Sequence, residues 1–332
     1  MTQRRRRLVA LAGGIMAALL PLVAAAQPAP KVWRVGVLRP GPAPLSPADT
    51  QVVSLPKALR ELGYEEGRNL VIERRYADAD VARLPDLARE LVQTRADVIV
   101  AVGAAATRAA RAASGSVPIV MFGNFDPLAL GLVSNLAQPG GNLTGVLIAP
   151  DGTLAGKRLE LLKSAVPTVS RIALLAPADE PAFGQQLQET HKAAAALGVR
   201  LTVAEVRGGD YVRAFAALAA DKPGALLVGA HTYFVRDRQQ IIALATQHRL
   251  PSMWEWREQA QDGGLMSYST SLYGLNQRIA SHIDRIFKGT KPGDIPIEQP
   301  TRFELVVNLK TAKALGVAIS PALRLQADEV IE

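Results

Sequence analysis

The chain has 332 residues, 48% of them apolar, and a formal net charge of +8, half of which comes from the four arginines at positions 4–7. It contains no cysteine, which excludes disulfide bonds, thiolate-ligated zinc and attachment to a membrane through a lipid-modified cysteine. The other basic residues are spread along the chain and form no cluster, so we expect no nucleic-acid partner.

Residues 1–26 predict a secretory signal peptide. The four arginines precede an uncharged run over 8–26 that ends in small residues, which is the order of a basic region, an apolar region and a cleavage site. A signal anchor that stays in the membrane is the alternative, and the small residues at the end of the run disfavour it. We therefore expect export, removal of the signal peptide after Ala26, and a soluble mature protein in the periplasm.

From residue 32 onward, short β-branched runs alternate with Ala- and Leu-rich stretches at helical spacing, which predicts parallel βαβ units. The first set of expected strands covers 32–38, 69–76, 97–103, 118–123 and 143–147. The expected helices of this set cover 52–63, 83–95, 104–113 and 127–136.

The alternation starts again after a turn-rich segment at 149–153. The second set of expected strands covers 171–176, 199–206, 224–230, 251–256 and 265–269. The expected helices of this set cover 154–166, 182–197, 210–220 and 235–248, and a helix over 274–288 opens the tail that follows. The remaining tail predicts a strand at 303–308 and a short helix.

Two sets of about five strands predict the α/β class, with two doubly wound parallel-sheet lobes and not one sheet of ten strands. We expect lobe 1 to comprise 27–149 with 270–294, and lobe 2 to comprise 150–269 with 295–332. This division follows because the helix after strand 265–269 can return to the first sheet and strand 303–308 can cross back to the second. Such crossing segments would form a multi-segment hinge.

Sequence motifs for catalysis or metal binding are missing. The chain has no G-x-G-x-x-G segment after a strand, no Walker loop and no G-x-S-x-G elbow. Its histidines lack metal-ligand spacing; they are His191, His231, His248 and His282. We therefore expect no enzyme activity, no metal and no cofactor.

Candidate ligand-binding residues lie where strands end, because open parallel sheets bind ligands beyond the carboxyl ends of their strands. Helix N-termini at this edge add free N–H groups and a positive dipole end, which suit a carboxylate. The loops expected there cover 39–47, 103–107, 123–127, 177–181, 229–234 and 255–259. The candidates in these loops are Ala104, Ala105, Thr107, Asn124, Asp126, Asp179, His231, Thr232, Tyr233 and Glu255.

Several candidates have a structural role as the alternative. Asp126 precedes Pro127, a favoured first helical residue, so it is expected to cap a helix over 127–136, a role that does not exclude ligand contact. Tyr233 suits core packing as well as a cavity wall. Glu255 stands between two tryptophans that are expected in the core, and it can receive a cation, pair with Arg257 or face solvent.

Six motifs spread over the chain carry a family resemblance. They are LGYEEGRNLVIERRYAD (62–78), ADVIVAVGAAAT (96–107), PIVMFGNFDPLALGLVSNLAQPGGNLTGV (118–146), KRLELLK (157–163), LPSMWEWREQAQDGGLMSYS (250–269) and PTRFELVVNLKTAKALGVAISPALRLQADEVIE (300–332). With these motifs, nearly the whole mature chain resembles the periplasmic substrate-binding proteins of ABC importers, in their tryptophan/tyrosine-type branch.

The resemblance implies a type I periplasmic-binding fold, with three crossing strands and closure around a small ligand. The Gly-Thr-Pro-Ala helix start that similar proteins direct at a ligand carboxylate falls at Gly103 to Ala106, where the hydroxyl is missing, so backbone donors and Thr107 are left. The Asp126–Pro127 pair is kept. A Glu-x-Asn-Ser-like segment near Asp179 is not kept, and an acidic position corresponds to His231 or Thr232. An amino acid, an aromatic acid and another small carboxylate therefore all stay open as ligands.

These observations favour the periplasmic solute-binding component of an ABC importer, a monomer whose partners are a small-molecule ligand and an ABC permease in the inner membrane. Ligand contacts made to both lobes at once would favour closure. A periplasmic sensor that presents its bound form to a membrane receptor is the alternative, and an enzyme on the same scaffold is a third hypothesis.

Overall fold

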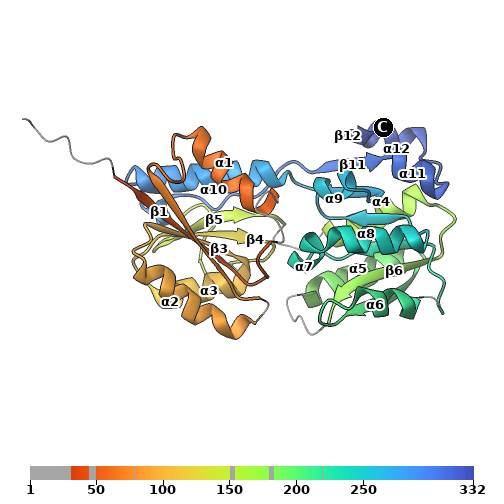
Figure 1. Cartoon of the computed structure of the whole chain (residues 1–332), viewed down its shortest axis with the longest axis horizontal. Coiled ribbons are helices and arrows are strands. Elements are labelled where there is room, and N and C mark those ends of the chain that lie inside the picture. The colour runs from red at the N-terminus through yellow and green to blue at the C-terminus, as the bar shows by residue number, and fades with distance from the viewer. Residues whose placement is uncertain (1–30, 45–49, 79, 150–153, 179–182, 219) are drawn as a thin grey trace, which may run out of the picture. The chain divides into compact units, whose positions relative to one another are not determined.

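The structure, a computed structural model, describes residues 31–44, 50–78, 80–149, 154–178, 183–218 and 220–332. The predicted signal peptide and the site candidate Asp179 lie outside these residues. Two sheets, of five and seven strands, each carry helices on both faces (Figure 1). The two-lobed α/β fold predicted from the sequence is therefore confirmed.

The first sheet has five parallel strands in the order β2-β1-β3-β4-β5. They are β1 (Trp33–Arg39), β2 (Leu70–Tyr76), β3 (Val98–Val102), β4 (Ile119–Gly123) and β5 (Leu143–Leu147). The strand order reverses between β1 and β3, because β2 lies on the outer side of β1. At such a reversal the loops leave in opposite directions and open a crevice at the carboxyl ends of the strands.

Helices cover both faces of the first sheet because its strands are apolar on both sides. Val98 and Val100 of β3 pack towards α1 and α10, whereas Ile99 and Ala101 pack towards α2 and α3. The helical segments of this lobe are α1 (Thr50–Glu61), the 3-10 turn η1 (Val81–Arg83), α2 (Leu84–Gln93), α3 (Gly103–Ala113), α10 (Leu272–Phe287) and the 3-10 turn η3 (Pro292–Asp294).

The second sheet has seven strands in the order β12-β11-β10-β9-β8-β6-β7. They are β6 (Arg171–Pro177), β7 (Arg200–Val206), β8 (Ala225–Val228), β9 (Ser252–Trp254), β10 (Met266–Ser269), β11 (Glu304–Asn308) and β12 (Glu329–Ile331). The pairing of β10 with β11 is antiparallel, so this sheet is mixed and not purely parallel. Strand β12, which the sequence pattern did not predict, pairs with β11 at its edge.

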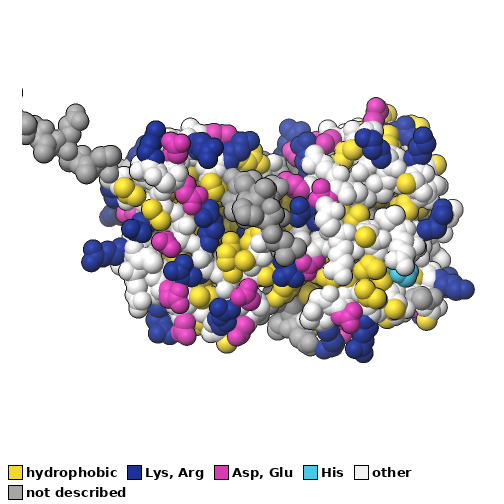
Figure 2. Space-filling view, viewed as in Figure 1, with side chains coloured by type: hydrophobic (Ala, Val, Ile, Leu, Met, Phe, Trp, Pro, Cys, Tyr) yellow, Lys and Arg dark blue, Asp and Glu magenta, His cyan; other side chains and the backbone are white. Residues whose placement is uncertain are grey.

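The second sheet also has two helical layers. Leu174 of β6 packs towards α4 and α5, while its neighbour Leu175 packs towards α6 and α8. The helices of this lobe are α4 (Leu154–Ala165), α5 (Gly184–Ala196), α6 (Tyr211–Leu218), α7 (Thr232–Arg236), α8 (Arg238–Gln247), α9 (Arg257–Gln261), α11 (Leu309–Leu315) and α12 (Pro321–Gln326). On the face shown in Figure 2, basic and acidic side chains are interspersed, so neither sign of charge dominates that surface.

The chain passes between the two sheets more than once. Helix α10 follows β10 of the second sheet but packs beside α1 on the first, where Tyr64 donates to Asp284 at 2.8 Å. Residues 295–298 also lie along the first sheet, because the amide of Glu298 donates to the carbonyl of Gly145 at 2.9 Å. Strand β11 then belongs to the second sheet. We propose that the last crossing of the hinge lies at 299–303.

Two predicted helices differ from the structure. Residues 127–136 form turns and not a helix, with Gly131 in the left-handed region at φ +63°. Their carbonyls bond to distant parts of the lobe: Leu132 accepts from Arg111 at 2.8 Å, and Leu136 accepts from the amide of Ile297 at 2.7 Å. The predicted helix 235–248 is divided into α7 and α8 at Asp237.

Candidate ligand-binding site

A cavity of about 220 Å³ lies at the carboxyl ends of the first four strands of lobe 1. Lobe 1 lines it with residues from β1 to β4, α1 and α10. Lobe 2 lines it with the segments that follow β8 and β9. The cavity therefore lies where the sheet topology of the first lobe opens a crevice, and residues of both lobes enclose it.

Two glycines bring the loops after β3 and β4 together at the cavity. Gly103 has φ +85° and Gly123 has φ +154°, both in the region that favours glycine. A Cβ atom on Gly123 would lie 3.2 Å from the Cα of Gly103, so a larger residue would push the two loops apart. This close approach allows Gly103 and Asn124 to line the same space.

Two arginines on neighbouring strands line the cavity. In the parallel register Val37 lies opposite Arg74 and Arg39 lies opposite Tyr76, so these four side chains share one face of the sheet. Arg74 is oriented by two hydrogen bonds to the carboxylate of Glu66, at 3.0 and 3.3 Å. A guanidinium group matches the geometry of a carboxylate, so lobe 1 provides groups that can bind an acidic ligand.

Among the described residues of lobe 2, one carboxylate lines the cavity, that of Glu255, which is 7% exposed. Its Oε1 lies 3.7 Å from Nη2 of Arg158, whose side chain is 3% exposed. Nε of Arg158 donates to the carbonyl of Tyr268 at 2.8 Å, whereas Nη2 has no hydrogen-bond partner among the described residues. Arg158 therefore relies on Glu255 for charge compensation.

Burial and nearby charges shift the pKa of Glu255 in opposite directions. Burial raises the pKa of Glu255 above its usual 4.5, and the nearby charges of Arg158 and then His231 oppose that rise. A buried carboxylate keeps its charge only when such partners are present. The Arg158–Glu255 ion pair is thus the main electrostatic feature on the lobe 2 side of the cavity.

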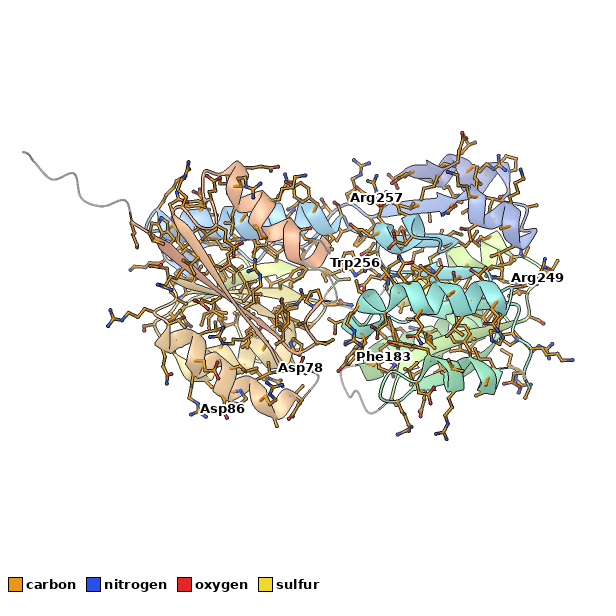
Figure 3. The ribbon with its side chains drawn as sticks, in the orientation of Figure 1. Asp78, Asp86, Phe183, Arg249, Trp256 and Arg257 are labelled. Atoms are coloured by element: carbon orange, nitrogen blue, oxygen red, sulfur yellow. The ribbon has the colours of Figure 1, made fainter. Side chains whose placement is uncertain are left out.

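A short segment of lobe 2 contacts lobe 1 beside the cavity. His231 is the N-cap of α7, and its Nδ1 accepts a hydrogen bond from the amide of Tyr233 at 3.4 Å. The hydroxyl of Tyr233 donates to the carbonyl of Asp78 at 3.3 Å; Figure 3 labels Asp78, which comes shortly after β2. The side chain of Thr232 faces Gly41, where an added Cβ would lie 2.5 Å from Oγ1 of the threonine.

The rest of the cavity wall is mostly apolar. Aliphatic side chains from the first sheet, including Ile72 and Val100, face Leu55 of α1 and Ile279 of α10 across it. Aromatic side chains of Tyr76, Phe122 and Trp256 also line the cavity. Trp256, labelled in Figure 3, follows β9 in lobe 2. An apolar cavity with a few polar groups is the usual form of a site for a small organic molecule.

The structure brings together four of the ten residues predicted from the sequence: Asn124, His231, Thr232 and Glu255 line the cavity. Tyr233 does not line it but takes part in the contact with Asp78. Ala104, Ala105 and Thr107 lie in the first turns of α3, next to the cavity-lining Gly103. The hydroxyl of Thr107 is fully buried and donates to the carbonyl of Gly103 at 2.9 Å, within its own helix.

Asp126 also lies outside the cavity lining. Its carboxylate accepts the amides of Leu128 at 2.8 Å and Ala129 at 3.1 Å. The capping bonds expected from the sequence are therefore present, but they stabilise a turn, since residues 127–136 are not helical. The structure thus assigns the Asp126 carboxylate a structural role.

Replacing Asp126 with alanine is expected to lower the free energy of unfolding by about 1 kcal/mol, because two turn amides lose their acceptor. Asp126→Asn keeps an acceptor oxygen and is expected to change stability by only a few tenths of that amount. Chemical denaturation of the three proteins measures the difference. Ligand affinity should be the same in all three, and a selective loss of affinity in Asp126→Asn would show that the charge meets the ligand.

Sequence reasoning did not name five residues that line the cavity, although two of them fall in the predicted loops 39–47 and 255–259: Arg39, Arg74, Tyr76, Trp256 and Asn276. The first three could have been found, because side chains alternate along a strand and those at the carboxyl ends of the expected strands 32–38 and 69–76 lie at the edge where ligands bind. Trp256 was expected in the core on the basis of a strand that reached residue 256. Asn276 lies on α10, where nothing in the local sequence marks it.

The sequence of the chain matches the model of one protein family over most of its length. The family model described as ABC transporter substrate binding protein matches residues 46–331. The chain belongs to this family. The resemblance inferred from the six sequence motifs is therefore confirmed.

Individual relatives agree with the family match. A tyrosine-binding protein of Clostridioides difficile (strain R20291) is 25% identical over 261 residues, which are 79% of this chain and 75% of that protein. The crystal structure of a conserved domain protein from Vibrio cholerae has a TM-score of 0.78 and 25% identity, covering 90% of this chain and 100% of that one. An ABC domain from Streptococcus pneumonia in complex with L-Trp has a TM-score of 0.75 and 23% identity, covering 91% of this chain and 100% of that one. The two structures share the two-lobed fold.

Within the described ranges, no group of three or more His, Asp or Glu side chains is arranged to hold a metal ion. None of the helices in the described part of the chain combines the length and the apolar character that crossing a bilayer requires.

Proposed function

We propose that this substrate-binding protein is the solute-capturing component of an ABC importer. Its ligand is a small organic carboxylate, in the range from an amino acid to an aromatic acid, and it binds between the two lobes. The observation that carries this proposal is the largely apolar cavity, which both lobes line and which contains arginines on one side and a buried carboxylate on the other.

Capture depends on closure of the two lobes. A ligand that contacts Arg39 in lobe 1 and Thr232 in lobe 2 at once has more contacts in the closed state than in an open one. Only this difference in contacts can shift the population towards closure. The closed form then becomes the form that a permease in the inner membrane recognises, and the protein acts as a monomer.

We also propose that the protein works in the periplasm. ABC substrate-binding proteins work outside the inner membrane, and the basic and apolar run at residues 1–26 supports export with cleavage after Ala26. Without a cysteine for lipid attachment, the mature protein diffuses in the periplasm. The mass of the intact protein from a periplasmic fraction tests this point, since cleavage there leaves Gln27 as the first residue.

Native mass spectrometry of protein purified from that fraction without denaturation tests solute capture. The expected result is one small molecule per protein, released unchanged on unfolding. The identified solute, added back at about 100 times its Kd, should stabilise the protein by roughly 2.7 kcal/mol. A chemically altered solute would indicate an enzyme. A protein that carries no solute and is stabilised by no amino acid, aromatic acid or dicarboxylate would contradict solute capture.

Cellular uptake separates import from sensing. Deletion of the protein is expected to abolish uptake of the identified solute at low external concentration. If uptake continues unchanged while the cell loses its response to the solute, the protein is a periplasmic sensor.

A further inference from the structure

A buried carboxamide group interrupts the apolar face that α10 turns to the cavity. Leu272, Asn276 and Ile279 all line the cavity, because residues three and four positions apart share one face of a helix. Leu272 and Ile279 belong to the core between α10 and the first sheet, and Asn276 lies between them with an exposure of 8%. A polar side chain is therefore buried in an aliphatic part of the wall.

Asn276 is held in place through its amide nitrogen. Nδ2 donates to the carbonyl of Leu272 at 2.9 Å, one turn earlier in the same helix. This bond fixes the orientation of the amide, because a carbonyl oxygen can only accept and must therefore meet the nitrogen. Oδ1 has no hydrogen-bond partner among the described residues. It is also not one of the unpaired atoms that are sealed in the interior, so it faces the cavity that Asn276 lines.

This arrangement is unfavourable for the fold by itself. Asparagine forms helices less readily than leucine, and a buried oxygen without a partner loses the hydrogen bonds that it makes in water. Leucine has the same branching and the same number of side-chain heavy atoms, and it would continue the aliphatic face formed with Ile279. Residues that oppose local stability are expected at functional sites. A hydrogen bond to a bound molecule therefore explains Asn276 better than the fold does.

A second acceptor lies on the lobe 2 side of the same cavity. Oε1 of Glu255 is 3.7 Å from Nη2 of Arg158, which is an ion pair but is too long for a hydrogen bond. An ionised carboxylate can accept about four hydrogen bonds, so Glu255 can accept from a ligand while it compensates the charge of Arg158. Acceptors from α10 and from the segment after β9 thus line one cavity, and both suit a ligand that donates.

From these features we propose that Asn276 selects ligands that carry an O–H or N–H donor in addition to their carboxylate. This inference rests on the proposed function and narrows its substrate class. The donor group of the ligand bonds to Oδ1 of Asn276 when the ligand lies against α10. A molecule of the same shape without the donor leaves this buried oxygen unpaired, and a site that is built to accept a hydrogen bond rejects such a molecule.

Calorimetric titration with matched compounds tests this selection. 3-Phenylpropionate has a ring and a carboxylate but no donor at neutral pH. L-Phenyllactate adds a hydroxyl beside the carboxylate, L-phenylalanine adds an ammonium group at the same carbon, and 3-(4-hydroxyphenyl)propionate adds a hydroxyl to the ring. At least one of these three compounds is expected to bind about tenfold or more tightly than 3-phenylpropionate. If none of them binds more tightly, the inference is wrong.

The variant Asn276→Leu is expected to remove this preference. It should weaken binding of the preferred compound about tenfold or more and should not weaken binding of 3-phenylpropionate. Gln277→Leu is the matched control, because the neighbouring carboxamide of Gln277 is exposed, donates to Glu61 at 3.2 Å and lies outside the cavity lining. This control should bind each compound as the wild type does. An equal loss of affinity for all four compounds in Asn276→Leu would assign Asn276 a structural role and overturn the inference.

The solute carried by protein from the periplasmic fraction provides an independent test. It is expected to contain an O–H or N–H donor besides its carboxylate, and its occupancy in native mass spectrometry should fall in Asn276→Leu but not in Gln277→Leu. A solute without a donor, or one that both variants retain equally, would overturn the inference and leave solute capture intact. A protein that carries no solute and binds none of the four compounds would overturn both.

Discussion

Replacing Arg158 with methionine is expected to destabilise the protein by about 3–5 kcal/mol near neutral pH, because Glu255 would be left as a buried charge without its guanidinium partner. Both side chains are at most 9% exposed, so water cannot replace the missing partner. Urea denaturation measures the change. Lys157→Met on the same helix is the matched control, since Lys157 pairs with Glu160 at an exposed position and its loss should cost at most about 1 kcal/mol.

Removing both charges should restore much of the lost stability. In the double variant Arg158→Met with Glu255→Leu, no buried charge is left, and buried ion pairs are often no more stable than apolar replacements of similar volume. A double variant as unstable as the sum of the two single variants would show that the two side chains do not compensate one another. Arg158 would then contribute through packing and through its bond to Tyr268.

The destabilisation in Arg158→Met should depend on pH with a defined sign. Burial already raises the pKa of Glu255 above 4.5, and loss of Arg158 removes the largest influence that opposes this rise. A carboxyl group with a raised pKa binds more protons in the folded state, so its contribution to stability falls as pH increases through the raised pKa. The stability difference from the wild type should therefore be larger at pH 8 than at pH 5. Equal differences at the two pH values would contradict the assignment to Glu255.

Most of the strands could be predicted from the hydrophobic pattern, with β12 as the exception. The β3 run from Val98 to Val102 is apolar on both faces, which identifies a strand covered by helices on both sides. Sequence reasoning also placed the site at the carboxyl edge, since that rule depends on sheet topology and not on particular side chains. Asn124 and His231, which were predicted in this way, line the cavity.

The turn conformation of residues 127–136 could not be predicted, because tertiary contacts overrode a local helix signal. Asp126 before Pro127 is a strong helix start, and the capping bonds do form. The carbonyls that a helix would use are bonded instead to Arg111 and Ile297, which are distant in sequence. Buried Leu132 and Val133 join the core of the α2 and α3 layer in this turn conformation.

The ion pair between Arg158 and Glu255 could not be predicted from the local sequence either. Arg158 lies on a helix whose sequence, KRLELLK, resembles an ordinary solvated face, yet its side chain is buried against Glu255. The strand expected to continue to residue 256 ends at Trp254, so simple alternation did not apply to Glu255 and Trp256, and both line the cavity. Long-range pairing of this kind requires the fold to be known.

Closure can be blocked at a single position outside the charged groups. Gly41→Leu is expected to weaken ligand binding roughly 10- to 100-fold, because overpacking by a few carbon atoms costs 1–3 kcal/mol. Even a Cβ at Gly41 would lie 2.5 Å from Oγ1 of Thr232, and the nearest atoms all belong to that threonine of lobe 2. The side chain would therefore oppose the approach of lobe 2 and not the folding of lobe 1. Calorimetric titration with the solute identified by native mass spectrometry measures the loss.

Side chains of increasing size at Gly41 test whether its contact with Thr232 controls ligand binding. Gly41→Ala should weaken binding less than Gly41→Leu, because a single methyl group requires a smaller displacement of Thr232. Gly115→Leu is the control, since a Cβ at that exposed glycine meets no atom of the described residues within 4 Å. All three variants should keep the unfolding temperature of the unliganded protein within a few degrees. If Gly41→Leu binds the solute as tightly as the Gly115→Leu control, contact between Gly41 and Thr232 is not part of the bound state, and the ligand must be held without the two segments meeting.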